Sequence, residues 1–199
     1  MDKTERLDFS VFGYQPSSFS DYPGRTAAVF FASGCNMKCS YCHNLKAMEE
    51  SGPLDDNKLK NCLDHAMSNK ISDAVVISGG EPTLQPEGLK KFIGEIKKRS
   101  KKLIKLDTNG TNPDLLKELL KDGLVDFVAM DIKGHFDSYD KFSFAGGPEA
   151  LYESAAAILK SGVDHEFRCT VGSDFEPKDL AFIKKNFPDI KLQKYRERK

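Results

Sequence analysis

The chain has 199 residues, enough for one compact domain with a sizeable core but too few for two comfortable ones. Its 30 basic and 30 acidic residues balance to a formal net charge of zero, which argues against broad electrostatic binding to nucleic acid or to an anionic membrane. No apolar run approaches the roughly 20 residues that span a bilayer, and no secretory signal is visible, so we expect a cytoplasmic protein.

Short apolar runs alternate with amphipathic helical patterns along the chain. Residues 7–14 are expected to form an edge strand ahead of this alternation. The elements that follow are predicted as strand 26–31, helix 54–68, strand 74–77, helix 86–96, strand 103–106, helix 113–120, strand 125–130, helix 148–159, strand 166–171, helix 177–185 and strand 190–192. Four of these helices begin at a proline, which suits the first helical position.

Strands that alternate with helices through short connections indicate parallel βαβ units with right-handed crossovers. The central strands are apolar throughout, as expected of strands that are covered on both faces. The pattern therefore predicts an α/β fold with a parallel sheet. The periodicity alone leaves open whether the six units form an open partial barrel or a doubly wound sheet.

Unusual residues gather where the predicted strands end, and in parallel α/β folds chemistry collects at the carboxyl ends of the strands. In chain order these segments are residues 35–42, 78–82, 107–110 and 131–133, with Arg168 inside the fifth strand. Each segment alone has an ordinary explanation, such as a glycine turn or a surface ion pair. Their convergence on one end of the sheet favours a functional site there.

The first of these segments contains three cysteines, Cys35, Cys39 and Cys42, spaced C-x3-C-x2-C. Three thiolates can hold three irons of a [4Fe–4S] cluster and leave the fourth iron open to a small molecule. A structural zinc site is the main alternative, with His43 as a nominal fourth ligand, although the adjacency of Cys42 and His43 makes tetrahedral ligation awkward. Redox-active or incidental thiols are the third possibility.

The three cysteines, together with Tyr41 and the Gly-Gly-Glu-Pro sequence of residues 79–82, make the chain resemble the radical S-adenosylmethionine (SAM) superfamily. The resemblance runs from about residue 20 to residue 195. It implies an α/β fold in the form of a partial (βα)6 TIM-like barrel with an open mouth, the mouth being the end at which the carboxyl ends of the strands meet. It also implies that residues 1–199 form a single radical SAM domain.

Within that superfamily, the chain most resembles the activating enzymes of glycyl radical enzymes. The segments that carry this likeness are residues 20–24, 42–44, 107–110 and 130–133. Two further segments, 166–171 and 192–195, look most like the activator of anaerobic ribonucleoside-triphosphate reductase.

The resemblance implies an oxidoreductase that works in an anaerobic setting, with a three-cysteine [4Fe–4S] cluster and SAM as cofactors. One electron would cleave SAM to methionine and a 5′-deoxyadenosyl radical, and that radical would remove a hydrogen atom from a glycine of a partner glycyl radical enzyme. A flavodoxin or a ferredoxin-type protein would supply the electron. No nucleic acid or membrane partner is expected.

The resemblance also assigns roles to individual residues. The cluster ligands would be Cys35, Cys39 and Cys42. The residues expected around SAM are Tyr41 or His43 beside the adenine, Gly79 and Gly80 near the methionine amino group, Glu81 as an anchor of that loop or as an acceptor from the ammonium, and Asp107, Thr108 and Asn109 near the ribose and the carboxylate. Asp131 and Lys133 would face the exit of the radical. Arg168 would bind a carboxylate or pair with Asp107 or Asp131.

The chain departs from the longer pyruvate formate-lyase-type activases because it carries no histidine after His165 and no second cysteine cluster. We expect the resulting open mouth to suit a protein substrate. A small-molecule radical SAM enzyme, such as a 7-carboxy-7-deazaguanine synthase, is the alternative within the superfamily. A zinc-stabilised interaction module is the non-enzymatic alternative.

Overall fold

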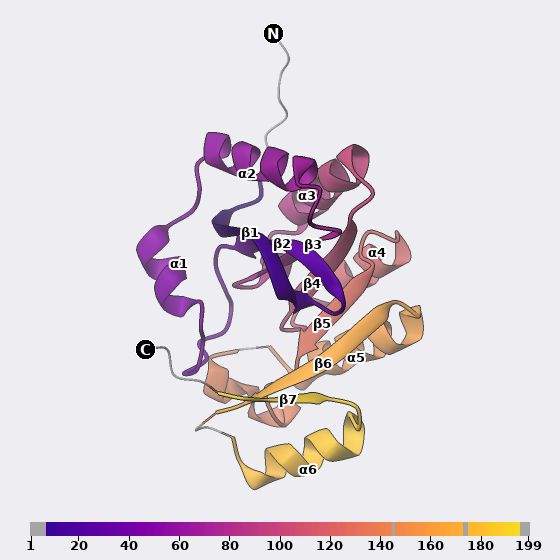
Figure 1. The fold of residues 1–199 in the computed structure, drawn as a ribbon. Coiled ribbons are helices and arrows are strands. Elements are labelled where there is room, and N and C mark those ends of the chain that lie inside the picture. The colour runs from indigo at the N-terminus through magenta and orange to yellow at the C-terminus, as the bar shows by residue number, and fades with distance from the viewer. Residues whose placement is uncertain (1–6, 145, 173–174, 196–199) are drawn as a thin grey trace.

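A computed structural model describes residues 7–144, 146–172 and 175–195. In this part of the chain seven strands form one sheet, and their order in space follows their order in the chain. β1 pairs antiparallel with β2, and every later pair of neighbours is parallel. Figure 1 shows the sheet curling through β1 (Val11–Tyr22), β2 (Arg25–Ala32), β3 (Ala74–Gly79), β4 (Leu103–Thr108), β5 (Phe127–Asp131), β6 (Asp164–Val171) and β7 (Lys191–Lys194).

The same part of the chain contains six α-helices, α1 (Leu45–Ser51), α2 (Asp56–Ser68), α3 (Pro86–Arg99), α4 (Pro113–Lys121), α5 (Pro148–Ser161) and α6 (Pro177–Asn186), and two 3-10 helices, η1 (Pro82–Leu84) and η2 (Phe136–Phe142). Proline opens α3 to α6, as predicted, because its fixed φ suits the first turn and its missing N–H has no intrahelical partner there. None of these helices is long and apolar enough to cross a membrane.

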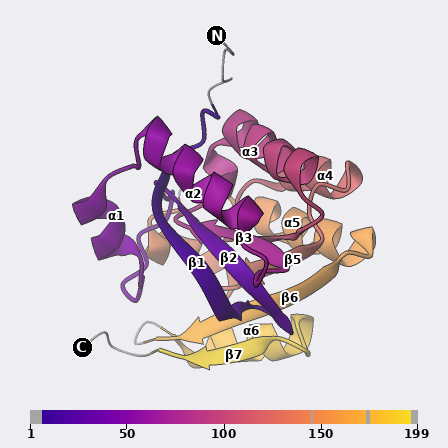
Figure 2. The ribbon, with the colours of Figure 1, turned by 45° about the horizontal axis from the view of Figure 1, so that its top comes forward.

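The winding of the sheet distinguishes between the two predicted architectures. A doubly wound sheet reverses its strand order at a switch point, whereas each parallel strand here lies beside the one before it. The prediction of a partial TIM-like barrel is therefore confirmed. β1 and β7 form the two edges of the curled sheet, and Figure 2 shows α2 to α5 along its outer side.

The two faces of the sheet have different cores. The outer face packs against the helices through a large apolar cluster that includes Phe30, Phe92 and Leu106. The inner face has a smaller apolar cluster, with Tyr22, Val76 and others, near the amino ends of the strands. Because side chains alternate across a strand, Ser78, Asp107 and Asp131 lie on this inner face, so along β3, β4 and β5 it changes from apolar to polar toward the mouth.

Several predicted boundaries differ from the structure. The predicted edge strand at residues 7–14 lies at Val11–Tyr22 and forms a hairpin with β2, because Gly24 takes a left-handed φ of 69° at the turn. β3 and β4 each run two residues beyond their predicted ends, so Gly79 and Thr108 belong to the strands rather than to loops. The short helices α1 and η2 were not predicted, because neither is long enough to show a clear helical repeat.

Candidate functional site

The three clustered cysteines lie on the cysteine loop, residues 33–44, which connects the carboxyl end of β2 to α1. Cys35 is exposed, Cys42 is half-buried and Cys39 is buried, and all three thiols are free. Burial raises the pKa of Cys39 to about 11, while the ammonium group of Lys133 lowers it and the other two thiols raise it. The other two thiols and the ammonium group of Lys133 therefore lie close enough to Cys39 to affect its ionisation.

The same cysteines were predicted to be metal ligands. Among the residues that the structure describes, no group of three or more His, Cys, Asp or Glu side chains is arranged to hold a metal ion. The donor set itself, three free thiols of which Cys35 and Cys42 both raise the pKa of Cys39, suits an iron–sulfur cluster better than a fourfold zinc site. Ligation of a cluster by these three residues stays a prediction.

Side-chain amides tie the cysteine loop to the strands behind it. Asn36 donates to the hydroxyl of Thr111 at 2.9 Å and accepts from the amide of Asn109 at 2.9 Å. Asn44 donates to the main-chain oxygen of Gly79 at 3.0 Å. The loop is therefore bonded both to the end of β3 and to the segment after β4, although about 70 residues separate the partners in the longest of these pairs.

The paired glycines at the end of β3 touch the cysteine loop closely. A Cβ on Gly80 would lie 1.8 Å from the main-chain oxygen of Gly34, and one on Gly79 would lie 2.5 Å from the main-chain nitrogen of Ala32. Gly79 also has a φ of +109°, which side chains rarely adopt. Both positions therefore require glycine, because a side chain at either one would collide with the backbone just before Cys35.

Glu81 follows these glycines and is completely buried. Its Oε1 accepts from the main-chain N–H of Thr83 at 3.1 Å, from the hydroxyl of Thr83 at 2.6 Å and from the hydroxyl of Thr108 at 2.8 Å. Its Oε2 accepts from the main-chain N–H of Asn109 at 2.6 Å. Burial raises the pKa of Glu81, and these donors oppose the rise. The geometry supports the first of the two predicted roles, an anchor between the ends of β3 and β4.

Asp107 at the end of β4 is also held from several directions. Oδ1 lies 2.5 Å from the ammonium group of Lys105, and Oδ2 accepts from the hydroxyl of Ser78 at 3.0 Å and from the guanidinium of Arg168 at 3.5 Å. Lys105 is fully buried and was not among the residues predicted from the sequence. The sequence does hold one clue to this contact: Lys105 lies two residues before Asp107 in a strand, and that spacing puts both side chains on the same face of the sheet.

Arg168 links this carboxylate to the neighbouring strand end. Its guanidinium lies 3.0 Å from Asp131 and 3.7 Å from Glu166, and Lys133 lies 3.6 Å from Asp131. Burial alone would raise the pKa of Asp131, but the positive charges of Arg168 and Lys133 bring it below its usual range. The prediction that Arg168 pairs with Asp107 or Asp131 is confirmed for both carboxylates.

Aromatic rings close the other side of the cysteine loop. Tyr41 lies edge-on to Phe142 with 6.1 Å between ring centroids, and its ring would lie 2.8 Å from a Cβ on Gly172. His43 stacks on Tyr195, with centroids 5.7 Å apart and planes 15° apart. The cysteine loop therefore reaches from β2 to the carboxyl ends of β6 and β7. Tyr195 was singled out in the sequence only as part of a family-like segment.

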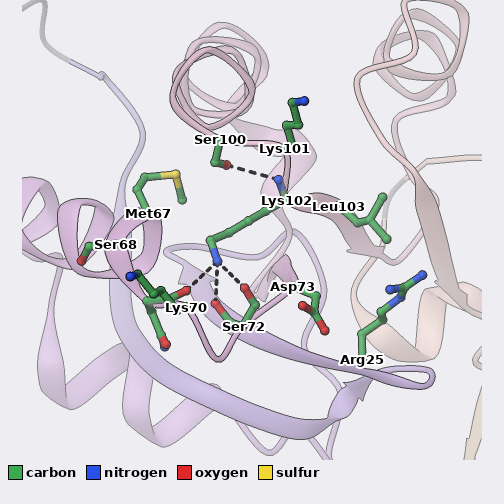
Figure 3. A pocket seen from close by; sticks show the side chains of 11 residues that line it. Arg25, Met67, Ser68, Lys70, Ser72, Asp73, Ser100, Lys101, Lys102 and Leu103 are labelled. Carbon is green, nitrogen blue, oxygen red and sulfur yellow. Dashed lines mark hydrogen bonds between the residues drawn. The ribbon is translucent and has the colours of Figure 1, made fainter.

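An open hollow lies at the opposite, amino end of the sheet. It has a volume of about 550 Å³ and is lined by four cationic side chains, Arg25, Lys70, Lys101 and Lys102. Figure 3 shows the ammonium group of Lys102 bonded to three oxygens, the main-chain oxygen of Asn69 at 2.8 Å, the hydroxyl of Ser72 at 3.1 Å and the main-chain oxygen of Ser72. α2 and α3 both end here, so the cations offset the partial negative charge of two helix ends.

Residues 29–184 match the profile of the radical SAM superfamily. The chain belongs to this superfamily. Over 133 residues it is 44% identical to a protein of Methanocaldococcus jannaschii with the provisional name glycyl-radical enzyme activating enzyme, an alignment that covers 66% of this chain and 53% of that protein. Over 150 residues it is 36% identical to the pyruvate formate-lyase-activating enzyme of Clostridium pasteurianum, covering 72% of this chain and 60% of that enzyme.

The fold of this radical SAM protein also matches solved structures. The structure of native anSMEcpe with bound AdoMet superposes with a TM-score of 0.62 at 23% identity, over 83% of this chain and 50% of that one. The chain spans between about half and three fifths of the length of the curated relatives it matches. The predicted superfamily and the predicted barrel are therefore confirmed, and the activity of the whole protein is a matter for proposal.

Proposed function

We propose that this radical SAM protein is an activating enzyme of a glycyl radical enzyme, with anaerobic ribonucleotide reductase as the partner. The cofactors would be a [4Fe–4S] cluster and SAM, whose one-electron cleavage supplies the 5′-deoxyadenosyl radical that takes a hydrogen atom from a glycine of the partner. The observation that carries the proposal is the cysteine loop packed onto the glycines at the end of β3, in a chain similar to two activating enzymes.

The proposed cluster ligands are Cys35, Cys39 and Cys42, which leaves one iron for the amino and carboxylate groups of SAM. Two features support this assignment. The thiols of Cys35 and Cys42 raise the pKa of Cys39, and the backbone of the loop is fixed by the close contact between Gly80 and Gly34. We propose that Gly79 and Gly80 let the backbone reach the methionine amino group, and that Glu81 holds that turn in place.

The proposed SAM pocket has an aromatic side and a charged side. Tyr41 and His43 would lie beside the adenine, supported by Phe142 and Tyr195. On the charged side, Thr108 and Asn109 are buried and bonded to Glu81. We therefore propose that these two residues form the floor of the pocket.

The remaining charged residues differ in how far they are exposed. The side chain of Asp107 is 10% exposed and has three partners, whereas that of Asp131, which pairs with Lys133, is 39% exposed. We propose that Asp107 orients Arg168, and that Asp131 and Lys133 face the bound SAM and the incoming glycine. Positive charge from Lys133 and Arg168 would favour the carboxylate of SAM. We further propose that residues 1–199 form one radical SAM domain.

The test is anaerobic reconstitution with iron and sulfide, followed by addition of SAM, a low-potential reductant and the candidate partner. The reductant replaces the flavodoxin or ferredoxin-type donor that we propose in the cell. We expect about four irons per chain by the cluster type, release of 5′-deoxyadenosine, and a glycyl radical signal in electron paramagnetic resonance. Cys39→Ala should abolish all three results, and Cys62→Ala, a half-buried cysteine on α2, should abolish none of them.

Three outcomes would contradict the proposal. A colourless protein that binds zinc and no iron would favour a structural module. Turnover of carboxy-tetrahydropterin by the reconstituted protein would favour a 7-carboxy-7-deazaguanine synthase. Release of 5′-deoxyadenosine without any glycyl radical on the reductase would reject the proposed partner while leaving the SAM chemistry intact.

A further inference from the structure

Asp179 is a buried carboxylate in the first turn of α6, the helix that connects β6 to β7 (Figure 1). Its side chain is fully inaccessible to solvent. One of its contacts is local, because Oδ2 accepts from the main-chain N–H of Glu176 at 2.9 Å and so completes a capping box at the start of the helix. The bond to Glu176 would be enough to cap the helix, but Asp179 also has partners outside α6.

Those further partners belong to a distant segment, residues 134–142, here called the post-β5 segment. Oδ1 of Asp179 accepts from the main-chain N–H of His135 at 2.6 Å, and Oδ2 accepts from the ammonium group of Lys141 at 2.9 Å. A Cβ on Gly134 would lie 2.6 Å from Oδ1 of Asp179. One carboxylate therefore holds both ends of the post-β5 segment against α6.

The post-β5 segment in turn contacts the proposed active site. The hydroxyl of Tyr139 accepts from the main-chain N–H of Lys133 at 2.7 Å, directly beside the cluster cysteines. The main-chain oxygen of Phe142 accepts from the main-chain N–H of Lys38, inside the cysteine loop, at 2.8 Å. The ring of Phe142 also lies against Tyr41. The path from Asp179 to the cysteine loop thus runs through consecutive short contacts.

The anchor depends on the charge of Asp179. Burial alone would raise the pKa of Asp179, but the N–H donors of His135 and Glu176 and the ammonium of Lys141 lower it, so the carboxylate is ionised at neutral pH. The backbone it holds has little preference of its own, because Gly134 has a φ of +147°, a region that glycine enters without cost. Phe182 of α6 also packs against His135, with ring centroids 4.4 Å apart, and the carboxylate adds the hydrogen bond that fixes the backbone at the start of the segment.

We infer that Asp179 is a positioning residue for the cysteine loop: through the post-β5 segment it fixes Lys38 and Tyr41, and with them the spacing of Cys39 and Cys42. The catalytic meaning of this role rests on the proposed radical SAM function, whereas the mechanical link itself does not. Asp179 touches neither the cysteines nor the proposed SAM pocket.

The experiment is amide hydrogen exchange on the full chain, with four variants. Asp179→Asn keeps the shape of the side chain but removes its charge. Asp114→Asn changes the acidic residue in the first turn of α4, whose carboxylate is 91% exposed and has no route to the cysteine loop. Ile183→Val removes a methyl group from the buried face of α6 and leaves the hydrogen bonds of Asp179 to His135 and Lys141 in place, and so controls for a general loss of stability in that helix.

We expect Asp179→Asn to speed exchange of the amides of residues 37–42 by about tenfold or more, as for loss of a hydrogen bond to a charged group. In the two control variants the exchange of these amides should stay as in the wild type. Lys141→Met, which leaves the bond to His135 in place, should give a smaller increase than Asp179→Asn. After reconstitution, Asp179→Asn should also hold less iron per chain and show a raised KM for SAM.

Unchanged exchange at residues 37–42 in Asp179→Asn would overturn the inference. An equal increase in Ile183→Val would overturn it as well, since the effect would then come from helix stability. A wild-type protein that binds iron but never cleaves SAM would instead reject the proposed function, and the exchange result would still decide whether Asp179 controls the loop. The two failures are therefore distinguishable.

Discussion

Two lysines, one just before β4 and one within it, show how the two ends of the sheet differ. Lys102, just before the strand, donates to neutral oxygens of Asn69 and Ser72 within the nearest turn, and burial lowers its pKa. Lys105, inside the strand, pairs with the carboxylate of Asp107, which is shared with Arg168. The first lysine completes a local structure, whereas the second belongs to a network that joins three strands.

The comparison teaches that the open hollow and the network of polar contacts lie at opposite ends of the sheet. The amino end of the sheet has an open hollow of about 550 Å³, whose cations satisfy helix ends close to them. At the carboxyl end, contacts from β2, β3, β4, β5 and β6 meet. Substitutions at each end of the sheet can measure this difference, as the loss of unfolding free energy that each one causes.

The largest effect is expected from Gly80→Ala at the carboxyl end. The new methyl group would meet the main-chain oxygen of Gly34 at 1.8 Å, and backbone on both sides must move to admit it. We expect the free energy of unfolding to fall by about 3 kcal/mol, with loss of iron uptake. Denaturant unfolding and iron analysis measure the two effects.

Gly94→Ala on α3 is the matched control, because no atom lies within 4 Å of the Cβ it would add. It should raise the free energy of unfolding by up to about 1 kcal/mol, since alanine favours a helix. Equal losses in Gly80→Ala and Gly94→Ala would show that the contact with Gly34 is not what requires glycine.

A smaller effect is expected from Arg168→Met, which removes the positive charge shared by Asp107 and Asp131. We expect the free energy of unfolding to fall by about 2 kcal/mol, less than for a fully buried pair because the side chain of Asp131 is 39% exposed. Lys191→Met is the control, because this exposed lysine pairs with Glu166 at the rim and should contribute less than about 1 kcal/mol. Urea titrations of both variants at neutral pH measure the difference.

The same variant predicts a pH dependence. Asp131 has a lowered pKa in the folded protein, so its contribution is present above the usual aspartate pKa of about 3.9 and is lost as the pH falls through the folded value. The difference in unfolding free energy between wild type and Arg168→Met should therefore stay constant from pH 7 to about pH 4 and shrink below that. A difference that grows on acidification would mean that Arg168 does not stabilise this carboxylate.

The smallest effect is expected at the amino end, from Lys102→Met. Three hydrogen bonds to neutral oxygens are lost, but those oxygens lie beside an open hollow and can bind water. We expect a loss of about 1 kcal/mol in the free energy of unfolding, and no change in iron content or in the KM for SAM. A clear rise in that KM would show that the two ends of the sheet are coupled after all.

How much the sequence predicts depends on the distance between partners along the chain. The cysteine loop, the Gly-Gly-Glu-Pro turn and the pair Asp131 and Lys133 were all visible, because each is a short motif at the end of an apolar run. The roles of Glu81 and Arg168 were left as alternatives, because their partners lie 27 and 61 residues away and only the sheet brings them together. Asp179 carried no local signal, since a helix-start aspartate is common and its distant partners appear only in the fold.

The aromatic contact between His43 and Tyr195 has a consequence for how the protein is made. The cysteine loop leaves the ribosome long before Phe142, Gly172 and Tyr195, the residues that pack against it. Until β6 and β7 have been synthesised, the cysteine loop has its contacts with β3 and β4 but lacks the rings and strand ends that pack against its other side. Loading with iron and sulfide is therefore expected to follow synthesis of the last strand, so that cofactor assembly is timed by the order of translation.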